Sequence, residues 1–101
     1  MSISAITHTA LSGMLAQTTR ASAIANNVAN ASTPGYGRLN TSFQSVEPSG
    51  VKASVTGTDQ DVDFAAELTD LIETEQSYKA NAVVFETGAD LWDVLMSIKR
   101  D

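Results

Sequence analysis

Apolar and small side chains recur with helical spacing along the first thirty residues. They are separated by alternating intervals of three and four, which places them on one stripe of a helix. The stripe consists of Leu11, Met14, Thr18, Ala21, Ala25 and Val28. Ser2 or Ser4 can cap the start of this helix. We therefore predict a helix over residues 1–31, whose other face is small, polar and uncharged except at Arg20.

A seven-residue repeat runs through the last forty residues. One series carries large side chains: Phe64, Leu71, Tyr78, Phe85 and Trp92. Its companion series is Leu68, Glu75, Ala82, Ala89 and Met96. Such a repeat is typical of a coiled-coil seam. We predict a helix over residues 62–101, with Asp59, Asp61 and Asp63 supplying the carboxylates that favour a helix start.

The middle segment, residues 32–61, contains the helix breakers. Thr33, Pro34, Gly35 and Tyr36 predict a type II turn, with Pro at the second position and Gly at the third. Two weakly alternating runs follow, at 39–45 and 51–55, separated by a Glu-Pro-Ser-Gly turn. This pattern favours a short β-hairpin.

The predicted helices are too long for a compact globular domain. A helix of about 37 residues is roughly 55 Å long, whereas a compact domain of this size has a radius of gyration of about 13 Å. We therefore expect a mainly all-α fold, in which the two terminal helices pair as an antiparallel coiled coil with a short loop or β-hairpin between them. The expected helix-pairing residues are Leu11, Met14, Ala21, Ala25, Val28, Phe64, Leu68, Leu71, Tyr78, Phe85, Trp92 and Met96. One pair buries only one stripe of each helix, so the chain should assemble with other chains.

Charge is distributed unevenly along the chain. The 101 residues carry a net charge of −6, yet residues 1–46 contain two arginines and no carboxylate. An acidic chain without a basic patch argues against nucleic-acid binding. No apolar run is long enough for a helix that is inserted into a membrane. The start of the chain also lacks the features of a cleaved signal peptide. Glu75, the one carboxylate on the predicted seam, is a candidate partner for Arg20, and an exposed ion pair of little consequence is the simpler alternative.

Candidate chemistry is sparse. There is no cysteine, and His8 is the only histidine. The Asp59-x-Asp61-x-Asp63 pattern resembles the opening of a calcium loop, but Phe64 and Asp70 stand where that loop needs Gly and Glu. We therefore expect no catalytic residue, no cofactor and no metal site, and the protein is predicted not to be an enzyme.

Two segments at opposite ends of the chain resemble one known family. Residues 25–36, Ala-Asn-Asn-Val-Ala-Asn-Ala-Ser-Thr-Pro-Gly-Tyr, together with Ala-Leu-Ser-Gly-Met at 10–14, resemble the N-terminal signature of bacterial flagellar axial proteins, the rod and hook subunits. Residues 62–72 and 77–82 resemble the C-terminal signature of the same family. Both signatures occur in the expected order.

The resemblance implies a structural subunit of the flagellar basal-body rod. In that family the terminal helices pair inside a helical tube, and subunits leave the cell through the flagellar type III apparatus without a cleaved signal. The implied partners are other rod or hook subunits, copies of this chain and the export apparatus. The implied subunit-interface residues are Asn26, Asn27, Asn30, Thr33, Pro34, Gly35 and Tyr36.

The three asparagines are poor helix formers, which suggests a role other than helix formation. Their amides can fix register between subunits, as a buried polar residue does in coiled coils. For Asn30, capping of the helix C-terminus is an equally good explanation.

Only 25 residues separate Tyr36 from Val62, fewer than rod and hook proteins usually have between their signatures. The resemblance is therefore closest to a small proximal-rod subunit. The alternative is a rod-like paralogue that acts as a soluble helical adaptor or regulator of assembly.

Overall fold

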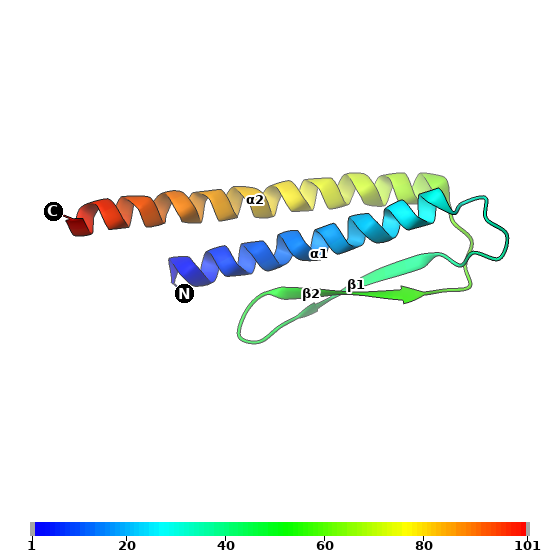
Figure 1. The fold of residues 1–101 in the computed structure, drawn as a ribbon, viewed down its shortest axis with the longest axis horizontal. Helices are drawn as coiled ribbons and strands as arrows, with labels where there is room; N and C mark the ends of the chain where they lie inside the picture. The colour runs from blue at the N-terminus through cyan, green and yellow to red at the C-terminus, as the bar shows by residue number, and fades with distance from the viewer. Residues whose placement is uncertain (1, 101) are drawn as a thin grey trace.

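Two long antiparallel helices and a two-stranded hairpin make up the structure (Figure 1). The computed structural model describes residues 2–100, with side chains described through Ile98. The elements follow in the order α1 (Ile3–Ala29), β1 (Leu39–Ser45), β2 (Val51–Gly57) and α2 (Phe64–Arg100). The predicted fold class is confirmed. The molecule measures 65 × 24 × 14 Å, and its radius of gyration of 17.6 Å reflects the long helices.

Both helices begin with a side-chain cap. The Ser2 hydroxyl accepts a hydrogen bond from the Ala5 N–H at 3.1 Å, which satisfies one of the free donors at the start of α1. At the start of α2, the Asp63 carboxylate accepts from the N–H groups of Ala65 and Ala66, at 3.1 and 3.4 Å. Ser2 and Asp63 therefore act as the sequence predicts.

The turn after α1 has the geometry that its sequence predicts. The Tyr36 N–H donates to the Thr33 carbonyl at 3.2 Å, and Gly35 has a φ of 78°. These two features define a type II turn with glycine at its third position. The turn reverses the chain, so β1 runs back beside α1.

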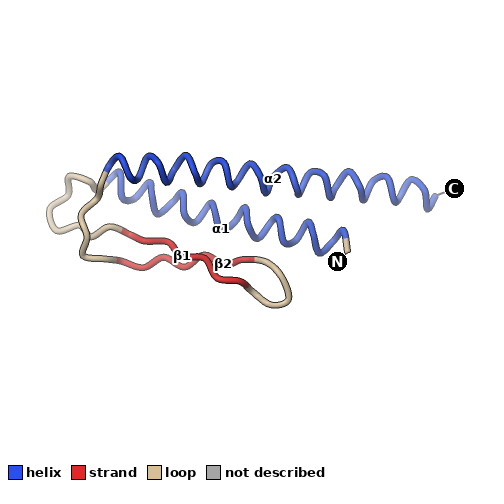
Figure 2. The backbone as a smooth tube through the Cα atoms, turned by 180° about the vertical axis from the view of Figure 1, so that it is seen from behind, coloured by secondary structure: helices blue, strands red, loops and turns tan. Residues whose placement is uncertain are grey.

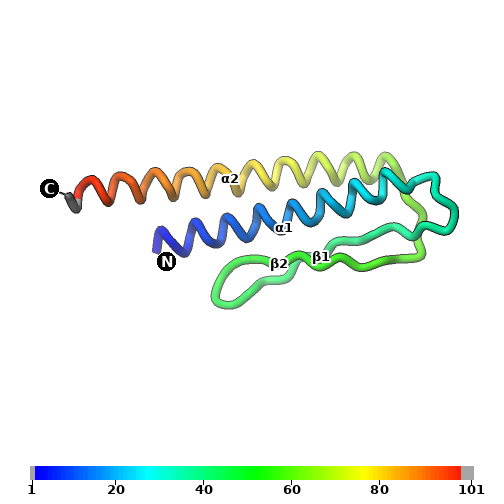
Figure 3. Tube along the Cα trace, in the orientation of Figure 1, coloured from blue at the N-terminus to red at the C-terminus, as the bar shows by residue number. Residues whose placement is uncertain are grey.

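The hairpin packs along α1, on the side away from α2, in both views of the backbone (Figures 2 and 3). The strands pair antiparallel from Leu39 opposite Gly57 to Ser45 opposite Val51. At the far end, the Val51 N–H donates to the Ser12 hydroxyl at 3.1 Å. The helix thus gives two strands the support that an isolated hairpin lacks in water.

Apart from Ile24, the residues that are buried in the two helices are small or polar. Those buried in α1 are Ala10, Gly13, Ala16, Ala23, Ile24 and Asn27, and those buried in α2 are Glu67, Thr74 and Gly88. A methyl group on Gly13 would lie 2.7 Å from the Asn81 side chain, and one on Gly88 would collide with Thr7. The two helices approach closely because these positions carry no side chain.

The large side chains of the predicted stripes are not buried between the helices, and their role in pairing stays a prediction. Between 38% and 54% of the surface is exposed at Leu11, Phe64, Leu68, Leu71, Tyr78, Phe85, Trp92 and Met96. Ala25 is also exposed, whereas Met14, Ala21 and Val28 are half-buried.

The predicted positions differ from the buried ones by a rotation about the helix axis. Leu11, Ala25 and Leu68 each follow a buried residue by one position, and one residue turns a helix by about 100°. The predicted stripes therefore lie about a quarter turn from the contact in both helices. Periodicity identified real stripes without determining which of them faces the partner helix.

Candidate functional site

A cluster of polar side chains joins α1, the turn, β1 and α2 at one end of the molecule. We call Asn27, Tyr36, Arg38, Glu67 and Asp70 the polar cluster. Its centre is the Asn27 side chain, which is 1% exposed. The Asn27 Oδ1 accepts from the Leu39 N–H at 2.8 Å and from the Tyr36 hydroxyl at 2.9 Å.

The amide nitrogen of Asn27 links α1 to both β1 and α2. Its Nδ2 donates to the Leu39 carbonyl at 2.9 Å and to Glu67 Oε1 at 3.2 Å. One side chain thus binds both backbone groups of the first residue of β1 and reaches α2. Because a buried backbone group without a partner is costly, Asn27 determines where the hairpin attaches.

Arg38 pairs with the buried carboxylate of α2. Its Nε lies 2.6 Å from Glu67 Oε1, and one of its terminal nitrogens lies 3.4 Å from Asp70 Oδ2. The Glu67 side chain is 0% exposed, and its second oxygen, Oε2, has no hydrogen-bond partner among the described residues. A buried carboxylate is tolerated only with a paired cation and hydrogen bonds. The ion pair with Arg38 and the hydrogen bond from Asn27 therefore stabilise Glu67 in its buried position.

Arg20 extends the cluster along the helix pair. Its guanidinium lies 3.2 Å from Glu73 and 3.5 Å from Asp70. The predicted pairing of Arg20 with Glu75 is wrong, because Glu75 pairs with Lys79 one turn later on α2, at 2.9 Å. The two arginines of the carboxylate-free half of the chain therefore both neutralise the start of α2.

The role expected for Asn27 between subunits needs correction. Its amide is fully used within the chain and is buried, so it is not free to bind another subunit. Asn26 is exposed on the surface of α1, and its role between subunits stays a prediction. The sequence analysis did not identify Arg38 and Glu67 as site residues. A signal was present, because Arg38 lies in a segment without carboxylates and its partner therefore had to come from the second half of the chain.

Asn30 occupies the C-cap of α1. Its φ of −107° is not left-handed, and its side chain donates from Nδ2 to the Asn26 carbonyl at 2.9 Å. The Thr33 hydroxyl donates to Asn30 Oδ1 at 3.2 Å. Asn30 therefore caps the helix through its side chain, without a left-handed backbone. Pro34 and Gly35 are exposed, while Tyr36 is half-buried because its hydroxyl reaches Asn27.

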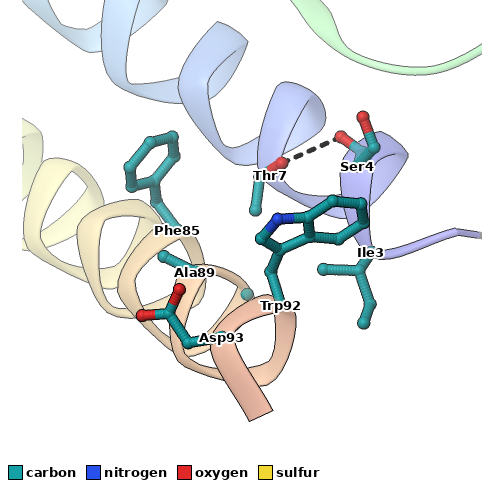
Figure 4. A pocket seen from close by; sticks show the side chains of 8 residues that line it. Ile3, Ser4, Thr7, Phe85, Ala89, Trp92 and Asp93 are labelled. Atoms are coloured by element: carbon teal, nitrogen blue, oxygen red, sulfur yellow. Dashed lines mark hydrogen bonds between the residues drawn. The ribbon is translucent and has the colours of Figure 1, made fainter. Parts of the chain in front are cut away.

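A second feature is an apolar groove along the flank of the two helices. Thr18 and Ala21 of α1 line it with Leu71 and Tyr78 of α2. Near the start of α1, a hollow of about 320 Å³ lies between the rings of Phe85 and Trp92. Figure 4 shows Ala89 between these rings, with Thr7 and Ile3 of α1 beside Trp92 and the Asp93 carboxylate at one edge. Residues of both predicted stripes therefore line the two separate hollows that we call the groove.

The site offers binding surfaces rather than reactive groups. Among residues 2–100, no three His, Asp or Glu side chains gather in a way that could hold a metal ion. Neither helix, over its described length, has an apolar stretch suited to crossing a membrane. What the arrangement presents is an outward apolar groove held in place by buried polar contacts.

Comparison with known proteins identifies the region that contains α1 and the turn. The model of the flagella basal body rod protein family matches residues 8–36. The flagellar hook protein FlgE of Brucella suis is 52% identical over 42 residues, which are 42% of this chain and 11% of that protein. FlgE of Rhizobium meliloti is 51% identical over 39 residues, 39% of this chain and 10% of that protein.

The family model covers part of the polar cluster and leaves Arg38, Glu67 and Asp70 outside. The matched segment 8–36 holds Gly13, Asn27, the turn and Tyr36. The chain spans about a tenth of the length of the hook proteins that it matches. Over this N-terminal region, the chain is similar to the flagellar rod and hook proteins.

Proposed function

We propose that this chain is a structural subunit of the flagellar basal-body rod, which assembles into the axial tube through its paired helices. One observation carries the proposal. Large apolar side chains along the whole of α2, together with Leu11 and Leu15 of α1, keep more than a third of their surface exposed. An exposed apolar surface of this extent marks a surface that another protein covers.

Burial of this exposed apolar surface would supply the free energy of assembly. A fully buried large apolar side chain contributes about 1.5–3 kcal/mol. Side chains such as Phe85 and Trp92 are already about half covered within the chain, so each retains roughly 1 kcal/mol for contact with a neighbour. Summed along α2, this is enough to favour association of subunits.

The compact middle segment supports a rod-type role over a hook-type role. A single hairpin connects α1 to α2, and it folds back against α1 instead of forming an outer domain. The matched hook proteins are about nine times longer than the part that aligns with this chain. We propose that its neighbours are other rod or hook subunits and copies of itself.

The remaining parts of the proposal follow from the similarity to rod and hook proteins. The chain would be exported unfolded through the flagellar type III apparatus, without a cleaved signal peptide, and would lie in the rod that spans the periplasm. Its role is mechanical and involves neither catalysis nor a cofactor.

An in-frame deletion of the gene tests the proposal by electron microscopy of hooks and filaments. We expect both to be lost and to return with the intact gene. Trp92→Glu, which places a charge in the groove, should fail to restore them. Gln76→Glu adds the same charge at an exposed position outside the two stripes and should restore them. Normal flagella in the deletion strain would contradict the rod role and favour the adaptor or regulator.

A further inference from the structure

The hairpin leaves one side of each strand without a strand partner among residues 2–100, since its sheet has only two strands. The Val46 N–H donates to the Gly50 carbonyl, and the Thr58 N–H donates to the Arg38 carbonyl, at 3.0 Å each. These bonds place the even-numbered residues of both strands in the ladder, because hydrogen-bonded pairs alternate along an antiparallel pair. The backbone groups of the odd-numbered residues therefore point outward from the two edges.

Helix α1 covers opposite edges of the hairpin at its two ends. Asn27 binds both outward backbone groups of Leu39, at the start of β1. Ser12, about four turns earlier on α1, accepts from the outward N–H of Val51 at the start of β2. Among the described elements, α2 contacts neither strand and lies on the far side of α1 (Figure 2). The rest of each edge, toward the end of its strand, is therefore open.

The open part of β1 lacks the features that protect a strand edge. Residues 39–45 contain no charge, proline or glycine, and Phe43 keeps 39% of its surface exposed. Edge strands are commonly protected by lysine, proline or bulges, because an open edge pairs with other strands. On β2, Lys52 supplies such a charge, and Gly57 weakens the open end. The edge of β1 is therefore the better acceptor of a further strand.

We propose that β1 pairs with β1 of a second copy of this chain, in antiparallel orientation, to form a four-stranded sheet. The outward residues Thr41, Phe43 and Ser45 are spaced evenly about Phe43. A two-fold axis at this position sets Phe43 opposite the second copy's Phe43, and Thr41 opposite its Ser45. Each residue pair then exchanges two N–H···O bonds. The same residues thus supply both halves of the contact, as an isologous interface requires.

The side chains favour a second copy as the added strand. Leu39 and Thr41 are half-buried while their even-numbered neighbours are exposed, so the odd-numbered side chains of β1 lie on the α1 side of the hairpin. The axis brings the two exposed Phe43 rings together on this side, where each covers apolar surface of the other. Because β1 carries no charge, no repulsion opposes the pairing. The inference goes beyond the proposed rod function, since this contact uses the hairpin and not the helices.

Disulfide cross-linking of the full chain tests the contact, because the chain has no cysteine of its own. Phe43→Cys places two thiols opposite each other, at a Cα separation of about 5.5 Å that suits a disulfide. Val55→Cys is the matched control, since Val55 is 42% exposed and lies on the edge of β2. Under mild oxidation we expect Phe43→Cys to form the covalent dimer at least about tenfold faster, because the paired strands hold the thiols together. Equal rates, or a faster Val55→Cys, would overturn the proposal.

Proline substitutions test the backbone bonds. Thr41 and Val55 face each other across the hairpin, and both N–H groups point outward, so proline at either position removes no ladder bond within the chain. Adding Thr41→Pro to Phe43→Cys should slow cross-linking roughly tenfold, because one bond is lost on each side of the axis. Adding Val55→Pro should leave the rate unchanged. Equal slowing by both prolines would contradict pairing through β1.

Charge exchange at the axis tests the register without changing the backbone. Phe43→Lys and Phe43→Glu should each lose the strand dimer, because like charges then lie directly opposite each other. Mixing the two variants should restore it, measured as a rise in sedimentation coefficient above both separate samples. No rise on mixing would overturn the two-fold register.

One variant separates this inference from the rod function. Trp92→Glu changes α2 alone, so it should leave the cross-linking of Phe43→Cys unchanged while it blocks flagellar assembly. Flagella that form normally with Trp92→Glu would count against the rod proposal and leave the strand pairing intact. Loss of cross-linking in Trp92→Glu would overturn the assignment of the contact to the hairpin.

Discussion

Replacing Asn27 by Ala is the most direct test of the polar cluster. The substitution removes four hydrogen bonds, to Tyr36, to Glu67 and to both backbone groups of Leu39. Each bond contributes about 0.5–1.5 kcal/mol, and a buried group left without a partner costs about 1–3 kcal/mol. Alanine regains roughly 0.6 kcal/mol in helix propensity. We expect a net loss of about 3 kcal/mol.

Asn26→Ala is the matched control. The residue is adjacent, exposed and of the same type, so the same substitution should be neutral or stabilise the chain by a few tenths of a kcal/mol through helix propensity. Both variants are unfolded in urea and followed by circular dichroism at 222 nm, at one low protein concentration. For a domain of this size, the difference corresponds to roughly 10–20 °C in Tm.

The comparison can refute the reasoning. If the free energies of unfolding of the two variants agree within about 0.5 kcal/mol, the buried amide does not hold the hairpin and the helices together. In that case the attachment of β1 must depend on the backbone of the turn. A loss confined to the hairpin, with α1 and α2 intact, would show that Asn27 secures β1 but not the helix pair.

Three further changes test separate contacts. Gly35→Val should cost about 1–2 kcal/mol in unfolding free energy, because the φ of 78° disfavours a β-branched residue although the surrounding space is open. Gly13→Val should cost about 1–3 kcal/mol by pushing Asn81 away, and Asn81→Ala should relieve part of this loss in a double-mutant cycle. Arg38→Met should cost about 3 kcal/mol, since it leaves the buried Glu67 unpaired, and adding Glu67→Leu should restore most of the loss in urea unfolding. Equal stability of Arg38→Met and the wild type would contradict the ion pair.

The close helix contact explains why the apolar groove faces outward. Gly13 and Gly88 let the backbones approach, and the Asn27–Glu67 hydrogen bond requires that approach. Large side chains in the seam would hold the helices too far apart for either contact. The polar residues thus fix which faces meet, and the stripes of large side chains are left for other chains.

Much of the local structure was present in the sequence. The caps at Ser2 and Asp63, the turn at Gly35, the hairpin strands and the extent of both helices all depend on interactions between near neighbours, which local patterns record. The expectation of partners also came from the sequence, because two long helices cannot bury all their apolar surface against each other, and it stays a prediction. The resemblance of residues 10–14 and 25–36 to flagellar axial proteins agrees with the family model, which matches residues 8–36.

Only the tertiary structure determined which stripes meet. A heptad pattern fixes the period of a stripe and not its direction, and a shift of one residue turns the face by about 100°. Whether Leu11 or Ala10 faces α2 depends on contacts between residues far apart in the chain, such as Gly13 with Asn81 and Arg38 with Glu67. Those contacts carry no periodic signal, because each is a single pairing across the fold. The sequence therefore determined the elements, and the packed structure decided which of their surfaces are buried and which stay exposed.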